Sequence, residues 1–212
     1  MKSEVFVLGG GPSLKNFDFC KLTQKNTIVT NKSILDVPSP SYFITVDYTF
    51  SRKIGTRCFS QIKTPKIFVA DFSHPFLKEK NGQIVDERYN MVYHLNDFNM
   101  VVKSYRADGI GFSFDDFRTG LNSGFCALQL AVILGYKRIY LLGVDLTITD
   151  ETHFHSGYGE SLQKFSEKLC TYENYFRIGL RGLLDSGIQV ISCSSISKLN
   201  DVISYKSVGE VL

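Results

Sequence analysis

The sequence lacks the features that mark membrane, secreted and nucleic-acid-binding proteins. The only apolar run near the N-terminus, Val5 to Leu8, is too short for a signal-peptide core, and no stretch reaches the roughly 20 residues that span a bilayer. The 24 basic and 21 acidic residues are scattered, so the net charge of +3 forms no basic stripe for nucleic acid. No Pro-, Gly- or Ser-rich linker divides the chain. We therefore expect a cytoplasmic protein with one domain, residues 1–212, that does not bind nucleic acid.

The cysteines also argue against two classes of small-domain architecture. There are five of them, an odd number, and no two form a Cys-x-x-Cys pair. A zinc site and a disulfide framework are therefore disfavoured. We expect the cysteines to be small buried hydrophobic residues in a reducing compartment.

The apolar runs that are present alternate with helical stretches, which indicates an α/β fold with a Rossmann-like, mostly parallel sheet. Several runs are continuously apolar, as in Val5 to Leu8, and this is typical of strands that are covered on both faces. We therefore predict helices on both faces of the sheet. The predicted strands are Glu4–Gly9, Thr27–Thr30, Tyr42–Val46, Lys66–Ala70, Arg138–Gly143 and Ile188–Ser192.

Two helices are evident. Gly124–Leu134 is apolar almost all round and must be buried, with Asn122 or Ser123 as its N-cap. Residues Ser161–Asp185 repeat apolar positions at three- and four-residue steps and predict an amphipathic cover for the sheet. Two segments, Asp71–Phe117 and Gly143–Glu160, fit no regular pattern, and we interpret them as irregular, lid-like or binding segments.

The first predicted strand runs into a glycine-rich loop. Glycines allow a tight turn and close approach to a ligand, and a proline suits the first position of a following helix. The N–H groups of that helix, with the Ser13 hydroxyl, would bind a phosphate. The loop matches neither the dinucleotide fingerprint nor the Walker loop. It consists of Gly9, Gly10, Gly11, Pro12 and Ser13.

Polar residues follow three other predicted strands. Asn31 and Asp47 come directly after a strand, and Asp145 follows one two residues on, at the edge where open α/β sheets bind ligands. Taken singly, Asn31 and Asp47 are equally common turn formers. Asp145 is suited to hold loop backbone, to bind a ribose or to coordinate a metal.

The polar loop beyond Asp145 holds two histidines, His153 and His155. With Asp150 and Glu151 nearby they form a weak signal for a divalent metal. A catalytic base is the more economical interpretation, because an imidazole can take a proton from a hydroxyl at neutral pH. A plain surface loop is the third alternative.

Arg118 precedes the buried helix. Its planar guanidinium suits a ligand carboxylate or phosphate. The alternative is a salt bridge to Asp115 or Asp116.

With these motifs the chain resembles the bacterial lipooligosaccharide sialyltransferases, which use CMP-sialic acid. It also resembles a wider group that includes motility accessory factors and archaeal 6-hydroxymethylpterin pyrophosphokinases. The residues that carry the resemblance are Gly9 to Lys15, Asn31, Asn122-Ser123-Gly124 and, above all, Ala131 to Asp145.

The resemblance implies a glycosyltransferase that moves a nonulosonic or related sugar from a CMP-sugar to a glycan or protein hydroxyl, without a metal or other cofactor. It implies that His155 deprotonates the acceptor and that Arg118 lies near the donor carboxylate. We also expect a homo-oligomer. The residues expected to hold the nucleotide and its phosphate are Gly9, Gly10, Gly11, Pro12, Ser13, Asn31, Asp47, Asn122, Ser123, Gly124 and Asp145.

Three positions depart from the sialyltransferase pattern. Gly10 and Asp47 stand where asparagines are expected, and Thr147 stands where a tyrosine is expected. A carboxylate close to phosphate is repulsive unless a cation intervenes, so Asp47 favours an alternative. That alternative is a Mg²⁺-dependent pyrophosphokinase with Asp47 and Asp145 as metal ligands. A nucleotide-binding protein without catalysis is the third interpretation.

Basic residues leave open a peripheral contact with the inner face of a membrane. Scattered basic residues are more often a solvated surface. The residues concerned are Lys2, Lys15, Arg52, Lys53 and Arg57.

Overall fold

The computed structural model describes residues 3–50, 56–155 and 162–212, and its centre is an eight-stranded sheet in the order β11-β10-β9-β1-β2-β3-β4-β8. Every pair of neighbouring strands in this sheet is parallel. The predicted α/β class with a mostly parallel sheet is therefore confirmed. The strands are β1 (Glu4–Leu8), β2 (Thr27–Thr30), β3 (Tyr42–Thr45), β4 (Lys66–Asp71), β8 (Met100–Ser104), β9 (Arg138–Leu142), β10 (Gln189–Ser192) and β11 (Ser204–Tyr205).

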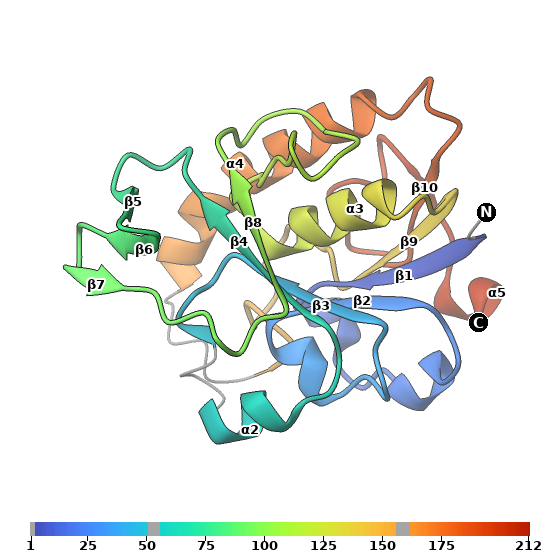
Figure 1. The fold of residues 1–212 in the computed structure, drawn as a ribbon. Helices are drawn as coiled ribbons and strands as arrows, with labels where there is room; N and C mark the ends of the chain where they lie inside the picture. Colours follow the sequence, from blue (N-terminus) through green and yellow to red (C-terminus); the bar gives the residue numbers. More distant parts are fainter. Residues whose placement is uncertain (1–2, 51–55, 156–161) are drawn as a thin grey trace.

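Successive side chains of β1 point to opposite faces of the sheet, and both faces are covered. Val5 and Val7 pack in the cluster that contains α3 (Ser123–Ile133) and α4 (Leu162–Arg181). Phe6 and Leu8 pack in a second cluster, with the short helices of the other face. Figure 1 shows α3 and α4 on one side of the sheet and α2 (Thr56–Gln61) and α5 (Val208–Val211) on the other. Helices lie on both faces, as predicted.

The helix α3 begins and ends as its sequence predicts. The Asn122 side chain accepts hydrogen bonds from the N–H groups of Gly124 (2.7 Å) and Phe125 (3.2 Å), which is the N-cap pattern. Gly135, just beyond the helix, has a φ of +82°, a left-handed conformation that suits glycine. The N-terminus of α3 lies at the carboxyl edge of the sheet, where Ser123 Oγ accepts the Val46 N–H at 3.2 Å.

The segment Asp71–Phe117, predicted to be irregular, contains regular structure. It forms a small antiparallel sheet of β5 (Leu77–Lys80), β6 (Gln83–Asp86) and β7 (Met91–Val92), and then β8, which pairs with β4. The small sheet packs on Tyr48, whose ring stacks on Tyr93 with centroids 3.8 Å apart. β5 is polar apart from Leu77, and β7 has only two residues, so neither carries the continuous apolar run that marks inner strands of the main sheet.

Two further findings concern the surface. Cys20, Cys58 and Cys170 are exposed, so the prediction of five buried cysteines is wrong for these three, while Cys126 and Cys193 are buried. Among the described residues, no helix is long and apolar enough to cross a membrane.

Candidate functional site

A cavity lies at the carboxyl ends of β1, β2, β3 and β9, the edge on which the predicted site residues were expected to meet. It has an inner compartment of about 90 Å³ and an outer one of about 370 Å³ that share Asn31, Asn122, Ser123, His153, Phe165 and Tyr172 as wall residues. Together the two compartments fall within the roughly 300–1,000 Å³ of small-molecule sites. The strand order reverses beside β1, which is where open α/β sheets bind ligands.

The glycine loop after β1 forms one wall of the inner compartment, through Gly9, Gly10 and Gly11. The Gly9 N–H donates to the Leu142 carbonyl, and the Gly11 N–H to the Gly143 carbonyl, both at 2.8 Å. A Cβ on Gly9 would overlap that Gly143 oxygen. Glycine is therefore required for the loop to pack against the end of β9.

The helix predicted to follow this loop is replaced by η1 (Pro12–Leu14), a single 3-10 turn. Asn16 then takes a left-handed φ of +64°, and the chain turns toward η2 (Phe19–Leu22). The prediction of a helix N-terminus is therefore wrong here. Three residues build up no appreciable helix dipole, so a dipole does not contribute to phosphate binding at this wall. Phosphate binding at this wall would depend on the loop backbone alone.

Asp145 takes the structural role among the three that the sequence left open. Its Oδ2 accepts the Ser13 N–H and its Oδ1 accepts the Ser13 hydroxyl, both at 2.7 Å, and only 2% of the residue is exposed. The Ser13 hydroxyl therefore points to Asp145, whereas the sequence predicted a donor for the ligand. Neither Pro12 nor Ser13 is a wall residue of the two compartments.

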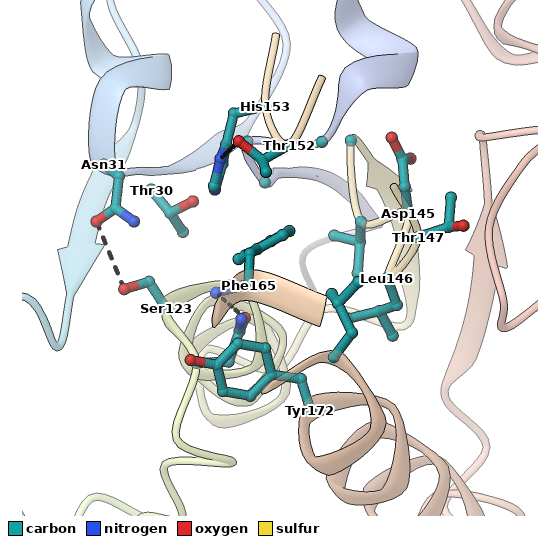
Figure 2. Close-up of a pocket in the computed structure, with 18 residues that line it drawn as sticks. Thr30, Asn31, Ser123, Asp145, Leu146, Thr147, Thr152, His153, Phe165 and Tyr172 are labelled. Atoms are coloured by element: carbon teal, nitrogen blue, oxygen red, sulfur yellow. Dashed lines mark hydrogen bonds between the residues drawn. The ribbon is translucent and has the colours of Figure 1, made fainter. Parts of the chain in front are cut away.

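A network of hydroxyl groups holds Asn31 at the junction of the two compartments. Asn31 Oδ1 accepts from Thr45 Oγ1 (2.8 Å) and Ser123 Oγ (3.5 Å), and Ser123 Oγ in turn accepts the Val46 N–H (3.2 Å). The network joins β2, β3 and α3. Figure 2 shows the oxygen of the Asn31 amide directed at Ser123 and its nitrogen on the cavity side. Asn31 thus presents an oriented donor to any ligand.

Asp47 lies in the outer compartment, apart from Asp145, which lines only the inner one. Asp47 Oδ1 accepts from the N–H (2.9 Å) and the hydroxyl (2.7 Å) of Thr49, a local turn. In the described parts of the chain, no group of three His, Cys, Asp or Glu residues is arranged to hold a metal. The structure therefore does not bring Asp47 and Asp145 together as a metal site.

Of the two histidines, His153 is the one that lines both compartments. Its Nδ1 lies 2.9 Å from Thr152 Oγ1, and its ring packs against Phe165 with centroids 4.7 Å apart. Figure 2 shows the imidazole pointing into the cavity above Phe165. His155 is not a wall residue of either compartment, and its Nε2 lies 2.5 Å from Asp36 Oδ2.

Arg118 is also held away from the cavity walls. Its Nε and Nη2 donate to Asp116 Oδ1 at 2.9 and 2.6 Å, and its Nη1 donates to the Asp108 carbonyl at 3.1 Å. This is the salt-bridge alternative that the sequence left open.

The N-terminal half of α4 supplies wall residues that the sequence interpretation missed. Phe165, Lys168, Leu169 and Tyr172 lie at i, i+3, i+4 and i+7 and therefore share one face of the helix. The same spacing was interpreted as a cover for the sheet. Lys168 and Tyr172 were a signal in the sequence, because lysine and tyrosine are seldom fully buried and therefore do not fit a face that only covers a sheet. Ser156 and Tyr158, which follow His155 in the sequence, lie outside the described residues.

Comparison with known proteins identifies relatives of the fold. No family model and no curated protein matches the sequence. A solved structure of the sialyltransferase CstII from Campylobacter jejuni with cytidine-5'-monophosphate matches with a TM-score of 0.53 at 15% identity, over 95% of this chain and 84% of that one. CstII with a trisaccharide acceptor and CMP gives a TM-score of 0.54 at 14% identity, covering 96% and 86%. The monofunctional α-2,3-sialyltransferase Cst-I from C. jejuni gives 0.51 at 15% identity, covering 96% and 80%. The chain therefore has a sialyltransferase-like fold.

Proposed function

We propose that the protein is a sialyltransferase-like glycosyltransferase that binds a CMP-sugar in the two-compartment cavity and transfers the sugar to a hydroxyl of a glycan or protein. The observation that carries the proposal is the oriented Asn31 amide, fixed by Thr45 and Ser123 beside the glycine loop. The cavity lies in a fold shared with transferases whose structures contain CMP.

In this proposal the phosphate lies in the inner compartment, against the glycine loop, and the rest of the CMP-sugar extends into the outer one. The loop of Gly9 to Gly11 allows close approach to the phosphate because it carries no side chains. Asn31 donates from its Nδ2 to an acceptor atom of the ligand. Gly10, where the resemblance expects asparagine, adds no side-chain contact, so Asn31 becomes the main side-chain donor beside the glycine loop.

The reaction is an in-line displacement at the anomeric carbon. The acceptor oxygen forms the new bond, the bond to the CMP phosphate oxygen breaks, and the acceptor proton passes to a base. We propose His153 as that base because its imidazole faces both compartments, whereas the resemblance implies His155. Holding donor, acceptor and base in one cavity supplies much of the acceleration.

The metal-dependent alternative receives less support from the residues themselves. Both Asp145 oxygens accept hydrogen bonds from Ser13, and Asp47 Oδ1 is engaged by Thr49. The two carboxylates therefore do not form the expected ligand pair.

A ligand screen tests the proposal. CMP and CTP should raise the melting temperature without added metal, and ATP with Mg²⁺ should not. CMP-sialic acid should then be turned over with lactose as acceptor, and His153→Gln should lower kcat by about two orders of magnitude, the typical contribution of a general base. Stabilisation by ATP that requires Mg²⁺, with none by CMP, would overturn the proposal.

A further inference from the structure

The segment of residues 151–155, which carries His153, is held at both ends against the glycine-loop side of the cavity. At its start, Lys15 Nζ contacts Glu151 Oε1 at 2.8 Å, and both side chains are about half exposed. An ion pair this exposed contributes little to stability.

Its other end is held more firmly. The Phe154 N–H donates to the Gly10 carbonyl (3.1 Å), and the Phe154 ring packs on Phe19 with centroids 5.6 Å apart. One residue further on, His155 Nε2 lies 2.5 Å from Asp36 Oδ2, and each of these two side chains is 27% exposed. A charge-assisted hydrogen bond that is largely shielded from water is among the stronger polar contacts in proteins.

Asp36 belongs to the element that also carries Asn31. It ends the 3-10 helix η3 (Asn31–Leu35), and that helix is fixed to the glycine loop by a buried bond from Ser33 Oγ to the Gly9 carbonyl, 2.6 Å long. The contact between Asp36 and His155 therefore ties the segment of His153 to the helix that begins at Asn31. Together with the bond from Phe154 to Gly10, this pair sets the position of the His153 segment relative to that helix.

We propose that Asp36 and His155 are a positioning pair, which we call the clasp pair, that holds residues 152–155 so that His153 faces the ligand. This inference rests on the proposed function and explains how His153, the base in that proposal, is held in position. An ionised carboxylate only accepts, so His155 donates from Nε2 to Asp36. His155 acts through the backbone of its own segment and does not touch the reacting atoms.

The clasp pair is tested with variants that distinguish the hydrogen bond between His155 and Asp36 from a role of the His155 imidazole as the catalytic base. His155→Ala and Asp36→Ala remove the contact, whereas His155→Gln keeps an N–H donor for Asp36 but cannot serve as a base at neutral pH. Hydrogen exchange of a peptide spanning residues 147–155 reports the bond from Phe154 to Gly10 without any substrate. Turnover of CMP-sialic acid and the Kd of CMP report function.

Each alanine variant should speed exchange of the Phe154 amide by about tenfold, since loss of such a bond favours local opening. Each should lower kcat while leaving the Kd of CMP nearly unchanged, and the double variant should be no worse than the singles. His155→Gln should stay close to wild type. Lys15→Met, which removes the exposed pair of the same segment, is the matched control and should change exchange by less than about twofold.

Two results would overturn the clasp pair. The first is unchanged exchange in both alanine variants. The second is a His155→Gln protein as inactive as His155→Ala with exchange at the wild-type rate, which would make His155 itself the base. Hydrogen exchange needs no substrate, so it tests the clasp pair independently of the proposed function. A wild-type protein that does not bind CMP would contradict the proposed function, and the exchange rates would still decide whether the clasp pair holds the segment.

Discussion

Ser13 donates two hydrogen bonds to Asp145, from its N–H to Oδ2 and from its hydroxyl to Oδ1, across 132 residues of sequence. The two bonds fasten the turn after β1 to the end of β9. Gly11 lies against the same carboxylate so closely that a Cβ there would overlap it. The shape of the glycine wall therefore depends on Asp145, although no ligand contact by Asp145 is needed.

Replacing Asp145 by alanine should reduce the free energy of unfolding by about 2–3 kcal/mol, because it leaves two partly buried donors of Ser13 without their acceptor. Ser13→Ala removes only the hydroxyl bond and should cost about 1 kcal/mol. Urea unfolding of both variants measures the difference. Equal stability of the two would show that the carboxylate does not fasten the loop.

Replacing Asn31 by alanine should weaken CMP binding at least about tenfold, since the half-buried donor proposed for the ligand is lost and its two hydroxyl partners lose their acceptor. Asn31 has a left-handed φ of +48°, so alanine also introduces backbone strain. Asn81, in the turn between β5 and β6, has a φ of +50° and is exposed, which makes Asn81→Ala a matched control for that strain. Calorimetric titration with CMP should show a loss of affinity for Asn31→Ala and none for Asn81→Ala.

The main sheet could be predicted from the sequence because its inner strands are covered on both faces. A run such as Val5 to Leu8 has no polar alternation to confuse it with a surface strand. The edge strand β8 was missed since Met100, Val101 and Lys103 are exposed, and β5 was missed since Lys78, Glu79 and Lys80 are exposed. At an edge or in a small sheet, strand pairing is stabilised by contacts that leave little pattern in the sequence.

The site was predictable only in outline. Parallel strands must deliver their carboxyl ends to one edge, so Asn31, Asp47 and Asp145 were expected there, and they are. The sequence does not tell which polar partner each side chain meets. Ser13 with Asp145 and Asp36 with His155 are pairs more than a hundred residues apart, and only the folded topology brings them together.

The thiols should divide into two classes. Burial raises the pKa of the Cys193 thiol to about 12 and that of Cys126 well above its usual range, and only the thiolate reacts. Labelling of the native protein with a disulfide reagent at pH 8 should modify Cys20, Cys58 and Cys170 quickly, and all five cysteines should react in urea. Rapid reaction of Cys126 in the native state would contradict its burial in the core.

Acid should weaken the small sheet through Asp86. This carboxylate is 1% exposed, and its hydrogen bonds with Arg88 hold its pKa below the usual range of aspartate. Because the folded pKa lies below the unfolded one, its stabilisation is present above about pH 4 and is lost as the pH falls through the folded pKa. Wild type should therefore lose more stability than Asp86→Asn between pH 7 and pH 3. Melting curves of the two proteins measure this, and parallel pH profiles would contradict it.

Arg118 should prove structural. Its guanidinium makes three hydrogen bonds, two to Asp116 and one to the Asp108 carbonyl, and its side chain is only 12% exposed. Arg118→Met should therefore lower the free energy of unfolding by about 1–3 kcal/mol and leave the Kd of CMP and the KM for CMP-sialic acid within about twofold of wild type. An arginine that met the donor carboxylate would behave differently. Its loss would raise the KM for CMP-sialic acid about tenfold or more without changing the affinity for CMP, which has no such carboxylate. Measuring both ligands on one variant therefore separates the salt bridge seen in the structure from the role that the resemblance implies.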